Sequence, residues 1–240
     1  MRLNRTALIT ATLATALANQ AHAAVATFVT ASPYAQFSDS PFFGIGNGNP
    51  NFYLEDFEDG LLNTPGASAV GGFVAVGPTA TVDSVDGDDG VLDGNGNNGN
   101  SWYSGGVATS MSFSFDAGVL GQLPTHVGIV WTDVGFVPSA PLGFDSVVLR
   151  AFDSEGVSLG GILFDNLGDG NANGGSAEDR FFGAIFAGGI SKITITSLGG
   201  SGDWEVDHLQ YGIQAVPVPG AAWMLAPALL GLMGLRRKRA

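Results

Sequence analysis

Apolar and polar residues alternate along much of the chain, as they do in strands with one buried face. In the clearest segment, 110–116, Met111, Phe113 and Phe115 alternate with serines and an aspartate. Together with the Gly, Asn, Asp and Pro residues between segments, the pattern predicts further strands at 51–57, 72–76, 126–132, 146–152, 157–164, 181–186, 192–197 and 204–211. Residues 153–156, Asp-Ser-Glu-Gly, predict a hairpin turn. Since no helical period is sustained, we expect an all-β fold, a single jelly-roll-like β-sandwich.

Two of these strands change phase halfway, at Glu55–Asp56 and at Asp207–His208. Such breaks indicate β-bulges, which re-aim side chains. If the two strands pair, Glu55, Asp56 and Asp207 meet, and carboxylates in such a cluster favour one bound calcium ion. The alternative is an exposed strand edge whose charges oppose aggregation.

The charge of the chain is distributed unevenly. All 22 acidic residues lie between Asp39 and Asp207, a stretch in which Arg150, Arg180 and Lys192 are the only lysine or arginine residues. Residues 24–214 therefore carry a formal charge of −19. Such a field repels phosphate backbones, which argues against nucleic-acid binding, and it favours cations; the alternative role is solubility alone.

The densest group of oxygen ligands lies in the Gly- and Asn-rich stretch 83–100, where Asp86, Asp88 and Asp93 are candidate calcium ligands. The spacing departs from the EF-hand pattern, and a solvated loop without an ion is the alternative. This stretch and 166–179 both predict surface loops. The chain has no cysteine, which excludes disulfides, thiolate metal sites and a cysteine nucleophile.

Exposed aromatic side chains beside polar groups are the residues that would bind sugars. The candidates are Trp102, Trp131 with Asp133, and Arg180 with Asp179. The alternative for each aromatic is packing in the core.

Catalytic residues are not expected. His126 and His208 are the only histidines after residue 23, and neither lies in a nucleophile or metalloprotease motif. A glycosidase needs only two carboxylates, so a carboxylate-pair hydrolase stays open as an alternative.

The N-terminus predicts a secretion signal. Arg2 and Arg5 precede an apolar run at 7–17 and the sequence Ala21-His22-Ala23, which fits a signal-peptidase site. We expect cleavage after Ala23, which leaves a domain at 24–214.

The C-terminal segment, 215–240, predicts a short membrane helix. An apolar stretch at 221–235 lies between a proline motif and a basic cluster, and that cluster should stay cytoplasmic. The motif and cluster consist of Val216, Pro217, Val218, Pro219, Arg236, Arg237, Lys238 and Arg239.

This order of features resembles the PEP-CTERM sorting signal that exosortases recognise, although Val218 stands where the motif usually has Glu. The resemblance implies passage across the inner membrane of a Gram-negative bacterium, transient anchoring, cleavage near 217–219 and release to the surface or exopolysaccharide matrix. An ordinary tail anchor is the alternative. Residues 52–212 also resemble the β-rich domains of such proteins, in segments 57–66, 124–128, 179–183 and 205–212.

Together these features favour a non-catalytic surface or matrix protein, processed by an exosortase-type enzyme, supported by calcium and associated with exopolysaccharide. The alternatives are a secreted glycan-active hydrolase and a purely structural coat component.

Overall fold

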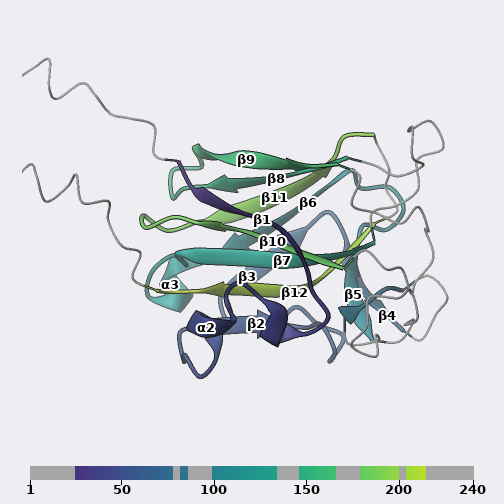
Figure 1. Ribbon diagram of the computed structural model, residues 1–240, viewed down its shortest axis with the longest axis horizontal. Helices are drawn as coiled ribbons and strands as arrows, with labels where there is room; N and C mark the ends of the chain where they lie inside the picture. Colours follow the sequence, from purple (N-terminus) through teal and green to yellow (C-terminus); the bar gives the residue numbers. More distant parts are fainter. Residues whose placement is uncertain are drawn as a thin grey trace, which may run out of the picture.

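The computed structural model describes residues 25–77, 82–85, 99–133, 146–165, 179–199 and 204–214 (Figure 1). These residues form an all-β, sandwich-like arrangement of two antiparallel sheets. The segments expected to be a signal peptide and a C-terminal sorting helix lie outside the described residues. In the part of the chain that is described, no helix has both the length and the apolar character needed to cross a membrane.

The larger sheet has seven strands. Six follow one another in the order β1 (Thr27–Pro33), β10 (Arg180–Ile185), β7 (His126–Asp133), β12 (Glu205–Gly212), β5 (Asn100–Tyr103) and β4 (Phe73–Val76). The seventh strand, β2 (Phe52–Glu55), pairs with the last four residues of β12.

The smaller sheet has five strands, in the order β3 (Ala67–Val70), β6 (Ser110–Phe115), β11 (Lys192–Ser197), β8 (Val147–Phe152) and β9 (Ser158–Phe164). The predicted hairpin turn joins β8 to β9, and the N–H of Asp153 donates to the carbonyl of Val157 at 3.0 Å. Figure 1 shows the strands of both sheets running along the long axis, with β9 at one margin and β2 at the other.

The nine predicted strands are all present, with ends that differ by one or two residues. Strands β1, β3 and β5 were not predicted. Strand β3 is short and β1 ends at a proline, whereas β5 begins inside the stretch interpreted as a loop. Their backbone groups are paired by neighbours from distant parts of the chain, which local alternation cannot show. The described residues also include three short helical turns: η1 (Phe37–Asp39), α2 (Phe43–Gly46) and α3 (Ala117–Leu120).

The main hydrophobic core lies between the sheets, where Met111 and Phe113 of β6 meet Ile129 and Trp131 of β7. The apolar residues of β6 therefore face the core, and the polar residues between them face solvent. A second cluster covers the outer face of the larger sheet, where Tyr34, Phe42, Val85, Val130 and Phe181 pack together. The central strands β7 and β12 of the larger sheet are thus buried on both faces.

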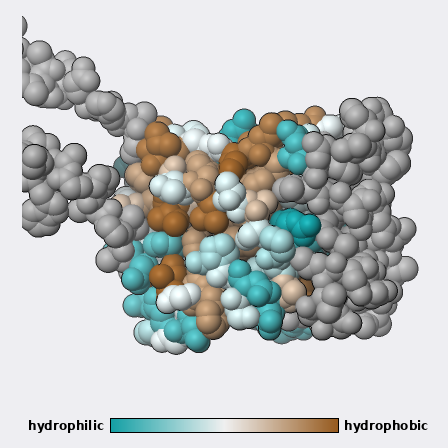
Figure 2. Space-filling view, in the orientation of Figure 1, coloured by the Kyte–Doolittle hydropathy of each residue, from teal (hydrophilic) through white to brown (hydrophobic). Residues whose placement is uncertain are grey.

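Gly128 permits this second cluster. A Cβ atom at this position would meet the Phe181 ring at 2.2 Å and the Phe42 ring at 3.1 Å. The absence of a side chain therefore lets two aromatic rings lie directly on the backbone of β7. Figure 2 shows apolar and polar residues mixed on the visible face, with hydrophilic ones gathered along the margin that holds α2 and β2.

Candidate functional site: the acidic end of the larger sheet

Strand β12 contains the bulge predicted from its phase break. Its pairing with β7 shifts register between Asp207 and Gln210, and His208 adopts a φ of 43°. On the opposite side β12 pairs with β5 through Glu205 and Val206, and with β2 beyond the bulge. The bulge therefore lies where the neighbour of β12 changes.

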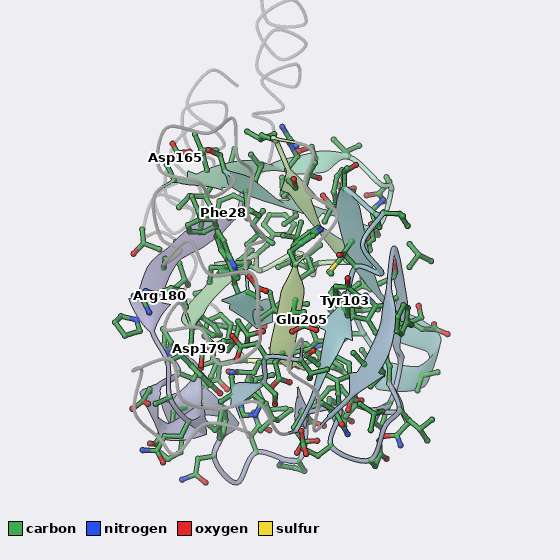
Figure 3. All side chains as sticks on the ribbon, turned by 90° about the vertical axis from the view of Figure 1, so that its right-hand side faces the viewer. Phe28, Tyr103, Asp165, Asp179, Arg180 and Glu205 are labelled. Atoms are coloured by element: carbon green, nitrogen blue, oxygen red, sulfur yellow. The ribbon has the colours of Figure 1, made fainter. Side chains whose placement is uncertain are left out.

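Five acidic residues are buried around the start of β12. Each is at most 3% exposed, and they are Asp83, Asp133, Asp179, Glu205 and Asp207. Figure 3 looks onto this end of the molecule, where Glu205 lies between Asp179 and Tyr103. The concentration of carboxylates at one end makes this the candidate functional site.

Glu205 carries the clearest electrostatic perturbation. Its Oε2 accepts the backbone N–H of Asp83 at 2.6 Å, whereas Oε1 is buried and accepts no hydrogen bond from the described residues. Burial raises the pKa of Glu205 to about 9, and the charges of Asp133 and Asp83 add to the rise. We therefore expect Glu205 to be a neutral carboxylic acid in the folded protein at pH 7.

The carboxylate of Asp207 accepts hydrogen bonds from the chain segment that crosses over it. Its Oδ2 accepts the Ser84 hydroxyl at 3.1 Å and the Val85 N–H at 3.0 Å, and its Oδ1 accepts the His208 N–H at 2.6 Å. The Thr132 hydroxyl donates to the Asp83 carbonyl at 3.1 Å. Together with Glu205, these contacts fasten residues 82–85 to the outer face of the larger sheet.

The carboxylate of Glu55 accepts hydrogen bonds from a different loop, the one that follows β2. It accepts the N–H groups of Phe57, Asn63 and Thr64 at 3.2, 2.8 and 2.9 Å, and the Thr64 hydroxyl at 3.0 Å. Asp56 accepts the N–H of Glu58 at 3.2 Å. Glu55 therefore shapes the turn that follows β2.

The calcium site expected from Glu55, Asp56 and Asp207 stays a prediction. Their strands do pair, with Glu55 opposite Leu209, but among the described residues no three His, Asp or Glu side chains are placed to hold a metal ion. Glu55 and Asp56 accept backbone N–H groups of the loop that follows β2, whereas Asp207 accepts hydrogen bonds from Ser84, Val85 and His208. The exposed-edge alternative is wrong for Glu55 and Asp207, because both are buried. The other candidate ligands, Asp86, Asp88 and Asp93, lie outside the described residues.

The expectation of exposed aromatic residues is not met at Trp102 or Trp131. Trp131 is 2% exposed and packs against Phe182, while Trp102 is 7% exposed and packs against Phe113. Both occupy core-facing positions of their strands, which the sequence pattern around them did not reveal.

The polar partners proposed for those aromatics are largely buried as well. Asp133 is 3% and Asp179 1% exposed, and Arg180 donates from Nη1 to the carbonyl of Asp179 at 2.8 Å. These residues therefore belong to the acidic end of the sheet and do not form an open sugar platform.

A buried polar network beside the bulge was missed by the sequence reasoning. The Tyr34 hydroxyl lies 2.8 Å from His208 Nδ1 and accepts Gln210 Nε2 at 3.0 Å, while the Ser40 hydroxyl donates to Gln210 Oε1 at 2.6 Å. Its members come from the first and last described segments of the chain. Only the change of phase at His208 hinted that polar side chains would point inward here.

Comparison with known proteins adds no relative: neither the family models, nor the curated proteins, nor the solved structures give a match.

The neutral state of Glu205 predicts a pH-dependent stability. An unfolded chain loses this proton near pH 4.5, whereas the folded protein keeps it up to about pH 9, so the stabilisation is fully present below 4.5 and is lost as pH rises through this window. Glutamine mimics the neutral acid. We therefore expect Glu205→Gln to reduce the slope with which the free energy of unfolding falls with pH, by up to ~1.4 kcal/mol per pH unit. Urea unfolding of both proteins between pH 5 and 8.5 measures the difference.

The matched control is Glu155→Gln, at an exposed position in the turn between β8 and β9. It should keep the pH dependence of the wild type. Identical slopes for the wild type and Glu205→Gln would show that Glu205 is ionised in the folded protein.

Proposed function

We propose that this chain is an exported, non-catalytic surface or matrix protein whose β-sandwich associates with exopolysaccharide. The observation that carries the proposal is the use of the buried carboxylates. Asp207 and Glu55 accept backbone and hydroxyl groups from neighbouring loops, and so act as structural acceptors. A hydrolytic pair would instead face substrate across a groove.

The proposed route of export rests on the two ends of the sequence. A signal peptide at 1–23 delivers the domain at 24–214, and the segment at 215–240, similar to PEP-CTERM signals, holds it transiently in the inner membrane. An exosortase-type enzyme then cleaves near Pro217–Pro219. The jelly-roll assignment of the sandwich is part of the same proposal, supported by the pairing of β2 with the last strand, β12.

This proposal predicts a mature protein that lacks both ends. Protein recovered from the cell surface or the medium should begin at Ala24 and contain no peptide with residues 236–239, because signal peptidase and the sorting enzyme remove them. Mass spectrometry of intact protein and of its peptides measures both ends. As a control, the inner-membrane fraction should still contain the basic tail, and finding that tail in released protein would refute the sorting step.

Calcium support is the second part of the proposal, and it concerns the acidic stretch rather than the buried cluster. Burial raises the pKa of Glu205, and Asp207 accepts hydrogen bonds from Ser84 and Val85, so we place the ion at the acidic stretch. The residues Asp86, Asp88 and Asp93 are the remaining candidate ligands.

Removal of calcium should then lower the melting temperature. An ion bound only by the folded state contributes about 2.7 kcal/mol at a hundredfold excess over Kd, which corresponds to roughly 5–10 °C for a domain of this size. Thermal unfolding with calcium and with a chelator measures the shift. The triple variant with Asp86, Asp88 and Asp93 changed to Asn should lose it, while Glu205→Gln should keep it. An unchanged melting curve in chelator excludes a structural ion.

A glycan-active hydrolase is the second candidate, and Glu205 is the observation that favours it. A carboxyl group with a pKa of about 9 beside the carboxylates of Asp133 and Asp83 has the character of a general acid with a neighbouring base. Against this, Glu205 is only 1% exposed and its Oε2 holds the Asp83 N–H.

Turnover separates the two candidates. We expect polysaccharide incubated with the purified protein to keep its chain length, because the carboxyl groups clustered around Glu205 are buried. A reducing-end assay with size analysis measures cleavage. Reducing ends that accumulate with the wild type and with Glu155→Gln, but not with Glu205→Gln, would establish the hydrolase.

A further inference from the structure

The outer face of the five-stranded sheet differs in composition from the rest of the domain. Met111, Phe113 and Phe115 of β6 point into the core, and the side chains between them point outward. The same alternation in the neighbouring strands brings serine, threonine and basic residues to the solvent side, together with the exposed Val70 of β3 and Leu163 of β9. We call this surface the hydroxyl face and define it by Ser68, Ser110, Ser112, Ser114, Thr194, Thr196, Arg150 and Lys192.

Strand register arranges these hydroxyl groups in rows. Ser112 lies opposite Thr194, which in turn lies opposite Arg150, and Ser110 lies opposite Thr196. The hydroxyls of Ser110 and Thr196 are 3.1 Å apart. Neighbouring strands are about 4.8 Å apart and alternate residues along a strand about 6.8 Å, so the face is a regular lattice of donors and acceptors.

The basic residues of the domain gather on the same face. Arg150 and Lys192 are two of the three Lys or Arg residues between Ala24 and Gln214. Arg150 is exposed, and Lys192 Nζ lies 4.4 Å from the centroid of the Phe152 ring. As diagonal neighbours across β8 and β11, their backbones are about 7–8 Å apart.

Acidic residues are missing from these strands. In a domain with 22 carboxylates, the five strands of this sheet contain no Asp or Glu. The nearest acids along the chain, Asp116, Asp145, Asp153, Glu155 and Asp165, lie in the segments that flank β6, β8 and β9. The strands of the hydroxyl face therefore carry two basic residues and no acidic residue, on a domain that is otherwise strongly acidic.

We propose that the hydroxyl face is the binding surface for an acidic polysaccharide, with Arg150 and Lys192 binding its carboxylates and the Ser and Thr lattice binding its hydroxyl groups. This inference rests on the proposed function and names the surface and the ligand class for it. An extended polyanion rich in hydroxyl groups matches both the charge and the hydrogen-bonding groups of the face.

Two other classes of partner fit the surface less well. A protein partner would be anchored by a desolvated cluster of aromatic or apolar side chains, whereas the exposed Val70 and Leu163 lie apart, on the two edge strands, and hydroxyl residues lie between them. A nucleic acid is held by many phosphate contacts, whereas this face offers two cations and otherwise mainly hydroxyl groups, which suit the hydroxyl groups of a sugar.

Substitution of the two cations tests the surface. The full chain, purified in native form, is titrated with polygalacturonate as the acidic probe and dextran as the neutral one. We expect Arg150→Gln and Lys192→Gln each to weaken polygalacturonate binding about threefold to fivefold. The double variant should weaken it at least about tenfold. Thr194→Val, which removes one hydroxyl without changing charge, should cost about twofold to threefold.

The control combines Arg150→Gln with Val76→Arg, because Val76 is 58% exposed on β4 of the other sheet and the added arginine restores the net charge away from the hydroxyl face. The affinity of this pair should stay within about twofold of that of Arg150→Gln alone, and wild-type binding should weaken with added salt. Circular dichroism and thermal unfolding check that every variant is folded. Recovery of wild-type affinity in the control would overturn the proposal, because net charge alone would then govern binding.

The remaining outcomes separate this inference from the proposed function. Wild-type protein that binds dextran or isolated matrix polysaccharide but not polygalacturonate would refute the acidic ligand and leave exopolysaccharide association intact. Protein that binds none of the three would refute both. A dimer in light scattering that dissociates in the Arg150→Gln, Lys192→Gln double variant would identify the face as a contact between copies of this chain and would overturn the proposal.

Discussion

The bulge in β12 is the constraint on which the rest of the larger sheet depends. Strand β12 pairs with β7 along one side, and on the other side with β5 before the bulge and β2 after it. Val206, Leu209 and Tyr211 all reach the main core although their spacing is uneven. This is possible only because the register shift at Asp207–His208 reverses the faces of the strand. A regular strand would turn either Val206 or the pair Leu209 and Tyr211 away from the core.

The same bulge determines what happens to the buried charge. Glu205 and Asp207 precede it in a strand that is buried throughout, so their carboxylates lose contact with water. The two buried carboxyl groups are stabilised in different ways: Asp207 accepts hydrogen bonds from Ser84 and Val85, whereas Glu205 is expected to keep its proton. Both arrangements depend on residues 82–85, which contact the two side chains. These buried acids therefore stabilise the fold. For this reason we propose that ligand binding takes place on another surface.

The two sheets differ in the charged and polar residues that they carry. The larger sheet contains buried acids and is covered on its outer face by the segment around Phe42. The smaller sheet contains no acids, presents hydroxyl groups and carries Arg150 and Lys192 on its outer side. On our proposal, a single strongly acidic domain can thus still offer a polyanion one surface without acidic residues.

The sequence by itself determined the all-β class, nine of the twelve strands, the β8–β9 turn and the bulge in β12, because these follow from the alternation of neighbouring side chains. It did not determine where the carboxylates and tryptophans point. Asp83 and Glu205 are 122 residues apart, and the donor that Glu205 receives exists only after β12 has paired with β7 and β5. Trp131 is buried because a second sheet lies against its strand. Only the tertiary structure decided these points, since long-range pairing sets which face of a strand meets water and which group reaches a carboxylate.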